Sequence, residues 1–526
     1  MRKIYTFIVL GLYFSAGNSY SQYTNIRVDG AGSWRPEEVT IAINPVNPNI
    51  LAAGANIDHF YVSTDAGITW GENNLTSTLG VWGDPCVLFD SLGNLYYAHL
   101  SNPVTGWWID RIVVQKSTDN GQTWNDGVGI GQNLQPQVQD KEWLAVDLTQ
   151  SPYRGNIYIT WTEFDDYGSS SANDSSRIRF SKSTDEGETW SDAITISDIS
   201  GNCLDGDNTT EGAVPCVGPN GEIYVSWAGP VGLVFDKSTD GGETWGTDIF
   251  VSDIPGGWAY DVSGISRCNG LPITMCDISD SPYNGDIYIC WSDQRNGTTN
   301  TDIFLSKSTD NGATWSPAAR VNDDNTTRHQ FFVWSTVDQS TGHLWFVFYD
   351  RRNTTGTATD VYVVKSTDGG NTFENFKVSE YSFTPTSSVF FGDYTNVTAW
   401  EGEIYPIWMR LHSGELSVWI APITDSSTIT TAQDEIFEPD DFLLYQNYPN
   451  PFNPATTISY QLPEAGYLTL KVYDMLGNEL ETLVDEVKPA GVHEFTFNSG
   501  DLSSGLYLYK MNSGNYEKTR KMLLLK

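Results

Sequence analysis

Short runs in which apolar and polar residues alternate recur along most of the chain, and each spans only a few residues. A period of two predicts β-strands with one buried face. The first two runs, Val39–Asn44 and Ile50–Ala53, form a strand pair joined by a turn. Six similar pairs follow: Cys86–Phe89 with Leu95–Tyr97, Trp143–Asp147 with Ile157–Trp161, Ala213–Val217 with Ile223–Trp227, Ile273–Ile278 with Ile287–Trp291, Val333–Val337 with Leu344–Phe348, and Tyr394–Ala399 with Ile404–Trp408. The pattern predicts an all-β chain built from seven repeated units.

An octapeptide closes the third strand in six of these units. Its first copy is Ser63-Thr64-Asp65-Ala66-Gly67-Ile68-Thr69-Trp70, and the later copies end at Trp124, Trp190, Trp245, Trp315 and Phe373. The Asp carboxylate can accept a backbone N–H two residues on, Gly allows a positive φ, and Trp can pack between neighbouring sheets. We therefore assign the repeated aspartates a structural role and no catalysis: Asp65, Asp119, Asp185, Asp240, Asp310 and Asp368.

A fourth strand follows most octapeptides, for example Ile194–Asp198 and Ile249–Asp253. The seventh unit ends at Leu416–Ile420 without a fourth strand, whereas Asn25–Asp29 carries the same pattern near the N-terminus. We predict that Asn25–Asp29 completes the last unit and closes the ring, so that no sheet edge stays exposed. Residues 23–423 are thus predicted to form a β-propeller, with seven blades favoured.

Residues 1–22 have the features of a secretory signal peptide. Arg2 and Lys3 precede the apolar stretch Ile4–Phe14, and small polar residues follow. That stretch is too short to span a bilayer and no later segment is longer, so we expect no transmembrane segment.

The C-terminal part of the chain differs from the propeller. Residues 424–441 are acidic and poor in large apolar residues, which is typical of a linker. Residues 442–526 return to short alternating strands, which predicts a small immunoglobulin-like β-sandwich.

The charge of the chain excludes one class of partner. The formal net charge is −37 at pH 7, and such a surface repels nucleic acids and anionic membranes. We expect no nucleic-acid partner, a well-solvated acidic surface and a monomer.

Six cysteines in an exported chain allow disulfides. Cys203 with Cys216, and Cys268 with Cys276, are close enough in sequence to close short loops, and we predict these two bridges. Cys86 and Cys290 lie in predicted strands and are expected to be buried thiols.

Polar residues gather where the loops of one propeller face meet around the axis. After the second strands lie Asp58, His59, His99, Glu163, Asp165, Asp166, Asp293, Arg295, Asp350, Arg351, Arg352, Arg410 and His412. Before the first strands lie Arg35, Glu37, Glu38, Asp84, Asp140, Lys141, Glu142, Asp205, Asp207, Glu211, Arg328, His329, Asp393 and Tyr394. A guanidinium binds a carboxylate through two parallel hydrogen bonds, so the arginines suit an anionic sugar such as a sialic or uronic acid. Alternatively, Asp–Arg pairs such as Asp293 with Arg295 bridge adjacent blades.

Calcium is a further candidate ligand. Asp205-Gly206-Asp207-Asn208 with Glu211, and Asn322–Asn325, offer clustered oxygen atoms that suit Ca²⁺. Neither segment has EF-hand spacing, and solvated loops are the alternative. We expect no required cofactor and keep Asp205 and Asp207 as candidate calcium ligands.

The six octapeptides match the Asp-box pattern, and the chain resembles the sialidase-like (BNR-repeat) β-propellers. This resemblance implies six blades, three arginines that hold the substrate carboxylate, a tyrosine nucleophile with a glutamate partner, and an aspartate as acid/base. Carried over by position, it implies Tyr394, Glu211 and Asp58 as catalytic residues. The arginine candidates are Arg35, Arg295, Arg351, Arg352 and Arg410. The Arg-Ile-Pro motif of sialidases is absent, and Trp34-Arg35-Pro36 stands in its place.

The C-terminal module resembles the type A C-terminal sorting domain of type IX secretion cargo. The motifs that carry this resemblance are Tyr445–Pro454, Val472–Gly477, Leu502–Tyr507 and Lys518–Met522. It implies the type IX secretion machinery as a partner and export through the periplasm and outer membrane, to the cell surface or beyond.

Two hypotheses for function follow. The first is an enzyme that acts on extracellular glycans, either a glycosidase or a lyase on an acidic sugar. The second is a non-catalytic propeller that binds glycans or proteins at the cell surface. An Arg/Tyr/Glu cluster in an axial pocket would favour the first hypothesis, and a flat face whose arginines are used between blades would favour the second.

Overall fold

The computed structural model describes residues 23–30, 36–102, 108–425 and 443–525, the last with gaps at 445–446, 448–449, 451, 463–465, 476, 489–490, 501 and 515. The chain divides into two compact units, Met1–Thr428 and Ile429–Lys526. The predicted signal peptide and nearly all of the predicted linker lie outside the described residues. The regular elements in the described ranges are all β-strands, and those ranges contain no helix of the length and hydropathy that crossing a bilayer requires.

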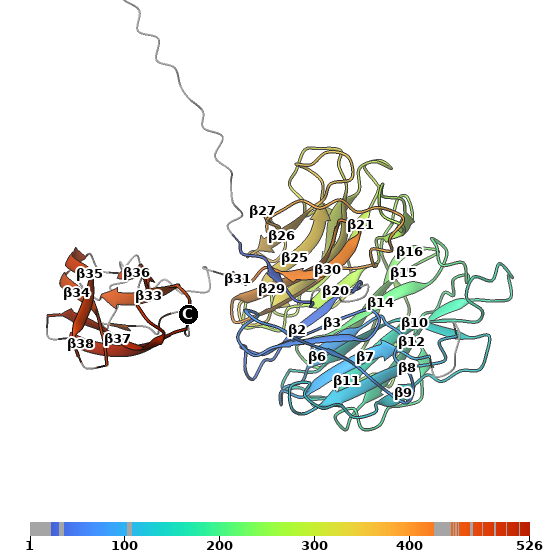
Figure 1. Ribbon diagram of the computed structural model, residues 1–526. Helices are drawn as coiled ribbons and strands as arrows, with labels where there is room; N and C mark the ends of the chain where they lie inside the picture. Colours follow the sequence, from blue (N-terminus) through green and yellow to red (C-terminus); the bar gives the residue numbers. More distant parts are fainter. Residues whose placement is uncertain are drawn as a thin grey trace, which may run out of the picture. The chain divides into compact units, whose positions relative to one another are not determined.

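The first unit consists of antiparallel sheets that we call blades 1 to 7 in chain order (Figure 1). Blades 1 to 3 contain β2 (Thr40–Ile43), β3 (Leu51–Ala55), β4 (His59–Ser63) and β5 (Gly71–Asn74); β6 (Cys86–Phe89), β7 (Leu95–Leu100), β8 (Ile112–Ser117) and β9 (Val128–Ile130); β10 (Val138–Val146), β11 (Ile157–Phe164), β12 (Ser176–Ser183) and β13 (Ile194–Thr195). Blades 4 and 5 contain β14 (Glu211–Val217), β15 (Ile223–Gly229), β16 (Gly232–Ser238) and β17 (Ile249–Ser252); β20 (Ile273–Cys276), β21 (Ile287–Asp293), β22 (Asp302–Ser308) and β23 (Ala319–Arg320). Blades 6 and 7 contain β24 (Gln330–Asp338), β25 (His343–Asp350), β26 (Asp360–Ser366) and β27 (Glu374–Lys377); β28 (Asn396–Trp400), β29 (Glu403–His412), β30 (Glu415–Ile420), β31 (Ile423–Thr424) and β1 (Ile26–Arg27).

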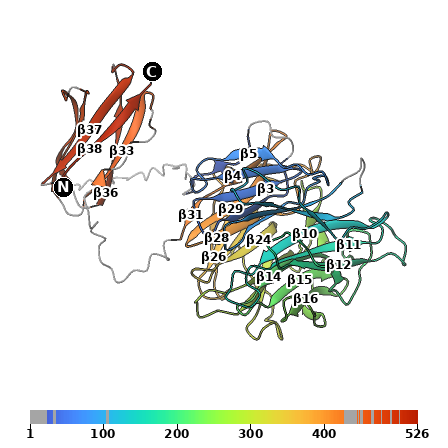
Figure 2. The same ribbon diagram turned by 90° about the horizontal axis from the view of Figure 1, so that it is seen from below.

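The blades close into a ring. The first strands contact one another in the cyclic order β2, β6, β10, β14, β20, β24, β28 and back to β2. Both ribbon views show the blue β3 of blade 1 beside the orange β29 of blade 7, where the two ends of the propeller meet (Figures 1 and 2). The ring of seven sheets agrees with the strand count in the sequence.

Strand β1 closes this ring. Ile26 pairs with Ile420 and Arg27 with Trp419 in antiparallel register. Val28 donates its N–H to the carbonyl of Val418 at 2.8 Å, and Asp29 Oδ1 accepts the N–H of Val418 at 2.7 Å. The predicted pairing of the N-terminal segment with Leu416–Ile420 is confirmed.

The octapeptides form the turns between third and fourth strands. In the first copy, Asp65 Oδ1 accepts the backbone N–H of Thr69 at 2.9 Å, and Oδ2 accepts the Thr69 hydroxyl at 2.6 Å. The accepted N–H therefore lies four residues on, not two as the turn chemistry suggested. Gly67 has φ +81°, as expected. Trp124 at the end of the second copy packs on Phe60 of blade 1 at 5.1 Å between ring centroids, so the aromatic residue joins neighbouring blades.

The blade 4 to blade 5 connection contains an additional two-stranded hairpin, β18 (Ala259–Tyr260) and β19 (Cys268–Asn269). Tyr260 donates its hydroxyl to the carbonyl of Asn269 at 3.0 Å and its hydroxyl also lies 2.5 Å from Ser292 Oγ. The hairpin is thereby attached to β21 of blade 5.

The second unit contains two antiparallel sheets around one apolar core. The sheets are β32 (Leu443–Leu444), β33 (Ala455–Leu462) and β36 (Gly491–Asn498), and β35 (Glu479–Lys488), β34 (Gly466–Tyr473), β37 (Gly505–Ser513) and β38 (Tyr516–Leu524). Leu470, Val472, Tyr509 and Met511 contribute side chains to that core.

The predicted disulfides are wrong, because all six cysteines are free thiols. Cys268 packs in the large core cluster with Tyr260, whereas Cys276 packs between blades 4 and 5, in the cluster against which Cys216 also packs. Short separation in sequence therefore does not bring the thiols of a predicted pair into one packing cluster. Cys86 and Cys290 are buried thiols, as expected.

Candidate functional site: an axial chamber

The first strands of three blades begin with a β-bulge. The register shifts lie between Asp140 and Trp143, between Glu211 and Val214, and between Phe331 and Trp334. One residue in each bulge has a positive φ: Lys141 at 51°, Gly212 at 79° and Phe332 at 53°. A bulge inserts an unpaired residue and re-aims its side chain. In this propeller all three bulged residues line one cavity.

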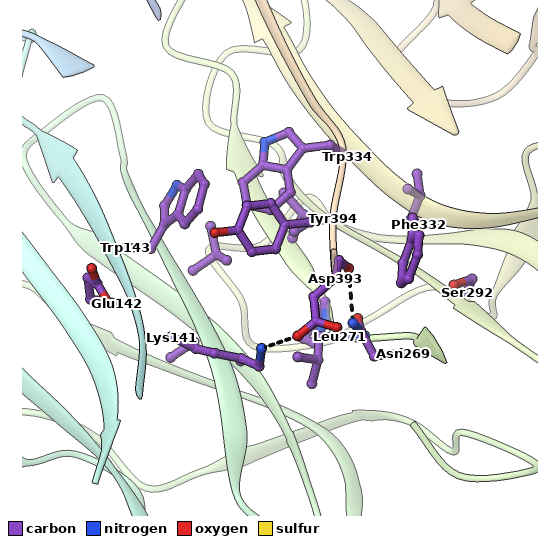
Figure 3. A pocket seen from close by; sticks show the side chains of 16 residues that line it. Lys141, Glu142, Trp143, Asn269, Leu271, Ser292, Phe332, Trp334, Asp393 and Tyr394 are labelled. Atoms are coloured by element: carbon purple, nitrogen blue, oxygen red, sulfur yellow. Dashed lines mark hydrogen bonds and ion pairs between the residues drawn. The ribbon is translucent and has the colours of Figure 1, made fainter. Parts of the chain in front are cut away.

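We call this cavity the axial chamber; its cavity volume is about 50 Å³, and the empty space around it, which includes open solvent, is about 560 Å³. Residues from blades 3 to 7 form its wall. Those with the chemistry or bulk that matters are Lys141, Glu142, Trp143, Asn269, Leu271, Ser292, Phe332, Trp334, Asp393 and Tyr394. In Figure 3 the three aromatic rings of Trp143, Trp334 and Tyr394 gather on one side of the chamber, and Lys141, Asp393 and Asn269 gather on another.

The aromatic rings form a floor. Trp143 and Trp334 lie 4.3 Å apart between ring centroids, and Tyr394 lies 5.7 Å from Trp143 and 5.9 Å from Trp334. Both tryptophans also line a second cavity, which runs along β10, β14, β20 and β24. The rings thus separate the chamber from the rest of the axial channel, and they present apolar faces that suit a sugar ring.

A buried ion pair crosses the chamber. Lys141 Nζ lies 2.6 Å from Asp393 Oδ2, and Arg267 Nε donates to Asp393 Oδ1 at 3.0 Å. Burial opposes the charge on Asp393, but Lys141 and Arg267 outweigh it and lower the pKa of Asp393 to about 2. Asn269 Nδ2 donates to the backbone carbonyl of Asp393 at 2.9 Å, so the β18–β19 hairpin and blade 3 hold Asp393 together. Asp393 is ionised at neutral pH.

The pKa values of two glutamates near this ion pair are shifted in the opposite direction. Glu142 is 1% exposed and Glu211 is fully buried, and neither carboxyl oxygen of either residue has a hydrogen-bond partner within the protein. Burial, with Asp84 and Asp140 nearby, raises the pKa of Glu142 well above its ordinary value. Burial and Asp205 do the same for Glu211. Both glutamates therefore keep their protons to a higher pH than an exposed glutamate does.

Other carboxyl groups add to this acidic surrounding. Burial and the charges of Asp84 and Asp393 raise the pKa of Glu38, whose Oε2 accepts a hydrogen bond from Asn56 Nδ2. Burial and Asp84 also raise the pKa of Asp140 to about 7. The chamber is thus an acidic site with a single ion-paired carboxylate in its wall.

Tyr394, the predicted nucleophile, lies in the chamber wall, and its hydroxyl points toward Trp143 (Figure 3). Burial, followed by the charges of Asp84 and Glu38, raises the pKa of this phenol well above its ordinary value. Glu211, its predicted partner, lies at the start of β14, next to the Gly212 that lines the chamber. Asp58, the predicted acid/base, instead accepts a hydrogen bond from Asn74 Nδ2 at 2.9 Å, and it is not among the residues that line the chamber.

Two of the predicted arginines link blades. Arg295 contacts Asp293 Oδ2 at 2.5 Å and donates to the carbonyl of Asp253 in the chain segment after blade 4 at 3.3 Å. Arg352 contacts Asp350 Oδ2 at 2.7 Å and also pairs with Asp323, which follows blade 5. The structure therefore places both arginines as the bridging alternative describes, away from the chamber.

Arg351 and Arg410 also lie outside the chamber wall. Arg351 is 1% exposed, and its guanidinium donates to Ser263 O at 2.8 Å and Thr359 Oγ1 at 3.0 Å. Arg410 lies against Trp419 and Tyr381, 5.4 Å and 5.8 Å from their ring centroids. Arg35 lies outside the described residues.

The sequence analysis missed Arg267 and Asn269. Both belong to the β18–β19 hairpin, which reaches the chamber from the connection between blades 4 and 5. The unusual length of that connection, from Ser252 at the end of β17 to Ile273 at the start of β20, is a signal that could have found them.

The candidate calcium ligands have separate protein partners. Asp205 Oδ2 accepts a hydrogen bond from Arg267 NH1 at 3.2 Å, and Asp207 Oδ1 accepts the N–H of Ala259 at 2.9 Å. Within the described ranges, no three His, Cys, Asp or Glu side chains are grouped so that they could hold a metal ion. Calcium binding by Asp205 and Asp207 stays an untested prediction.

Comparison with known proteins agrees with the two resemblances seen in the sequence. Residues 446–525 match the family model described as "Secretion system C-terminal sorting domain". A sialidase from Bacteroides fragilis (strain YCH46) is 26% identical over 317 residues, which are 53% of this chain and 52% of that protein. The chain thus spans about half the length of this curated relative.

Solved structures with a similar arrangement include sialidases and an arabinofuranosidase. Hadza microbial sialidase Hz136 has a TM-score of 0.40 and 14% identity, over 71% of this chain and 73% of that one. The GH93 α-L-arabinofuranosidase of Fusarium graminearum, in complex with arabinobiose, has a TM-score of 0.43 and 13% identity, over 65% and 93%. Trypanosoma rangeli sialidase, in complex with the inhibitor DANA, has a TM-score of 0.40 and 13% identity, over 86% of each chain.

The chain therefore combines a sialidase-like β-propeller with a C-terminal sorting domain of type IX secretion. The sorting domain indicates export to the cell surface or the extracellular space by the type IX machinery.

Proposed function

We propose that the protein is an exported glycoside hydrolase that acts on extracellular glycans in the axial chamber. One observation carries this proposal: Glu142 and Asp393 line the same chamber, and their surroundings push their pKa values in opposite directions. Glycosidases use such a divided pair, because one carboxyl must donate a proton while the other must be ionised.

In this proposal Glu142 is the general acid. Its proton would go to the glycosidic oxygen of the leaving sugar, and the buried, unpartnered carboxyl has no competing hydrogen bond to break. Asp393, ionised and held by Lys141 and Arg267, would stabilise the positive charge that develops on the sugar ring. Trp143, Trp334 and Tyr394 would stack against the sugar and exclude water.

Tyr394 stays the candidate nucleophile from the family resemblance. Of the carboxyl groups near its phenol, Asp84 acts on its charge most strongly and is the one that would serve as its base. Tyr394→Phe tests this role, because the variant would stop turnover only if Tyr394 is the nucleophile.

The test is hydrolysis of a panel of neutral, sialylated and uronic-acid oligosaccharides by the full chain, with Glu142→Gln, Asp393→Asn and Tyr394→Phe compared. Glu142→Gln should lower kcat by about 100-fold or more, because general acid catalysis contributes roughly that much. Glu243→Gln is the matched control, because the side chain of Glu243 is 72% exposed. Hydrolysis that survives Glu142→Gln unchanged would refute the assignment.

A non-catalytic binding propeller is the second candidate. The observation that favours it is the use of Arg295 and Arg352 in contacts between blades instead of at the chamber. If the full chain binds a sugar of the panel but releases product from none of them, the result would favour this alternative.

A further inference from the structure

We infer that the axial chamber selects sugars without a negative charge, so that its ligand is a neutral glycan and not a sialic or uronic acid. This inference rests on the proposed function and names the substrate class of the same site. It reverses the expectation that the arginines in the sequence suggested.

The cations at the chamber are already neutralised. Lys141 is the one lysine or arginine among the described residues that line it, and its ammonium contacts Asp393. Arg267 contacts both Asp393 and Asp205. A ligand carboxylate would have to displace Asp393, a protein carboxylate that two cations and the hairpin already hold.

The carboxyl groups at the chamber outnumber these two cations. Glu142 lines the chamber, is 1% exposed and has two oxygen atoms without a partner. Glu211 and Glu38 are buried close by, and Asp84 acts on the charges of Glu142 and Tyr394. These oxygens can accept hydrogen bonds from sugar hydroxyls, whereas a ligand carboxylate brought into the same low-dielectric space would lose its water, find no free cation in the chamber wall and be repelled by the ionised Asp393.

Of the predicted arginines that the structure describes, none lies in the chamber wall to compensate for this. Arg295 and Arg352 are held by Asp293 and Asp350. Arg351 and Arg410 lie outside the chamber wall, against Phe331 and Trp419 respectively. The described part of the chamber wall therefore offers stacking surfaces and hydrogen-bond acceptors to a sugar, and no free cation for an acid.

The test compares ligands that differ only in charge. Calorimetry with the full chain at neutral pH would use trigalacturonic acid and its trimethyl ester, sialyllactose and its methyl ester, and neutral arabino- and gluco-oligosaccharides. We expect each ester to bind at least about tenfold more tightly than its acid, because like charges brought together in an interface cost several kcal/mol. Asp393→Asn removes the carboxylate that pairs with Lys141 and Arg267, so it should lower the ratio of ester affinity to acid affinity by about tenfold. The exposed control Glu243→Gln should leave this ratio unchanged.

A second measurement needs no variant and stays decisive if Asp393→Asn fails to fold. Added salt screens repulsion, so it should strengthen binding of the acids and leave binding of the esters unchanged. An acid that binds the wild-type chain as tightly as its ester, or that salt weakens, would overturn the inference and leave the proposed function standing. Binding of no sugar at all by the folded chain would overturn both.

Discussion

Lys141 and Asp393 meet at 2.6 Å although 252 residues separate them in the sequence. Lys141 belongs to the bulge in blade 3, and Asp393 precedes the first strand of blade 7, so the pair spans the ring from opposite sides. The side chains are 11% and 1% exposed. The contact therefore couples the closure of the ring to the shape of the candidate site.

Breaking this pair from one side should destabilise the propeller strongly. We expect Lys141→Met to lower the free energy of unfolding by about 3 kcal/mol, because the buried Asp393 then keeps only the partly exposed Arg267 as its counter-charge. The double variant Lys141→Met/Asp393→Asn should recover much of that loss. Urea unfolding of the full chain followed by tryptophan fluorescence measures both, and equal losses in the single and double variants would show that the ion pair does not matter.

The raised pKa of Glu142 makes the stability of the protein depend on pH. The pKa of Glu142 is raised in the folded protein, whereas a glutamate in the unfolded chain ionises near pH 4.3, roughly its ordinary value. The folded state therefore binds the extra proton, and the stabilisation is complete at low pH and lost as the pH rises through the folded pKa.

Glu142→Gln removes this proton binding. We expect the variant to gain unfolding temperature over the wild type as the pH is raised from about 4 to about 8, with the smallest difference at the acidic end. Differential scanning calorimetry across this range, with Glu243→Gln as the exposed control, provides the check. A difference that is constant with pH would contradict the raised pKa.

Strand pattern allowed most of the fold to be predicted. Local sequence determines the alternating runs, the repeated Asp-box turns and the isolated segment Asn25–Asp29, so the strand or turn conformation of each can be predicted from its own residues. The partners of a charged side chain depend instead on the three-dimensional arrangement. Arg295 and Arg267 look alike in the sequence. Arg295 binds Asp293 within its own blade, whereas Arg267 binds Asp393, which precedes the first strand of blade 7.

The disulfide prediction was wrong for the same reason, because the partner of a thiol also depends on the three-dimensional arrangement. Short separation in sequence suggested Cys268 with Cys276, but Cys268 lies in β19 of the hairpin and Cys276 in β20 of blade 5, and the two thiols pack in different clusters. The Asp-box turns were predictable because their hydrogen bonds join residues of one octapeptide, as between Thr69 and Asp65.

Arg352 offers a test of the difference between structural and functional arginines. It contacts Asp350, whose side chain is fully buried and also accepts a hydrogen bond from Gln330 Nε2 at 3.2 Å, and its guanidinium lies 4.4 Å from the Tyr362 ring centroid. Arg352→Ala should cost about 3–5 kcal/mol of unfolding free energy by leaving Asp350 without a counter-charge. Sugar affinity should be unchanged at a temperature where the variant is folded.

Calorimetric unfolding and sugar titration on the same preparation separate these effects. The double variant Arg352→Met/Asp350→Asn serves as the control, since it removes both charges and should restore part of the stability. Loss of sugar binding in a variant with wild-type stability would instead return Arg352 to the site.

The closure of the ring by β1 predicts a specific failure when that strand is disturbed. Val28 is 3% exposed, and its N–H binds Val418 O at 2.8 Å. Asn25 donates its N–H to Glu380 Oε1 at 3.0 Å, and Glu380, which follows blade 6, donates its N–H to Asn25 Oδ1 at 2.8 Å. Val28→Pro removes the N–H and should detach the strand, because proline cannot donate to a ladder. The unpaired edge of β30 would then be available to a second molecule.

We therefore expect Val28→Pro to lower the midpoint of thermal unfolding and to make the protein associate as its concentration rises, which light scattering would detect. Val28→Ala is the matched control, since it loses side-chain packing but keeps the N–H, and it should lower the midpoint without association. If Val28→Pro stays monomeric and unfolds where Val28→Ala does, the hydrogen bonds of β1 do not protect the edge. Association confined to Val28→Pro would show that this short strand, supplied by the far end of the chain, keeps the last blade from pairing with another molecule.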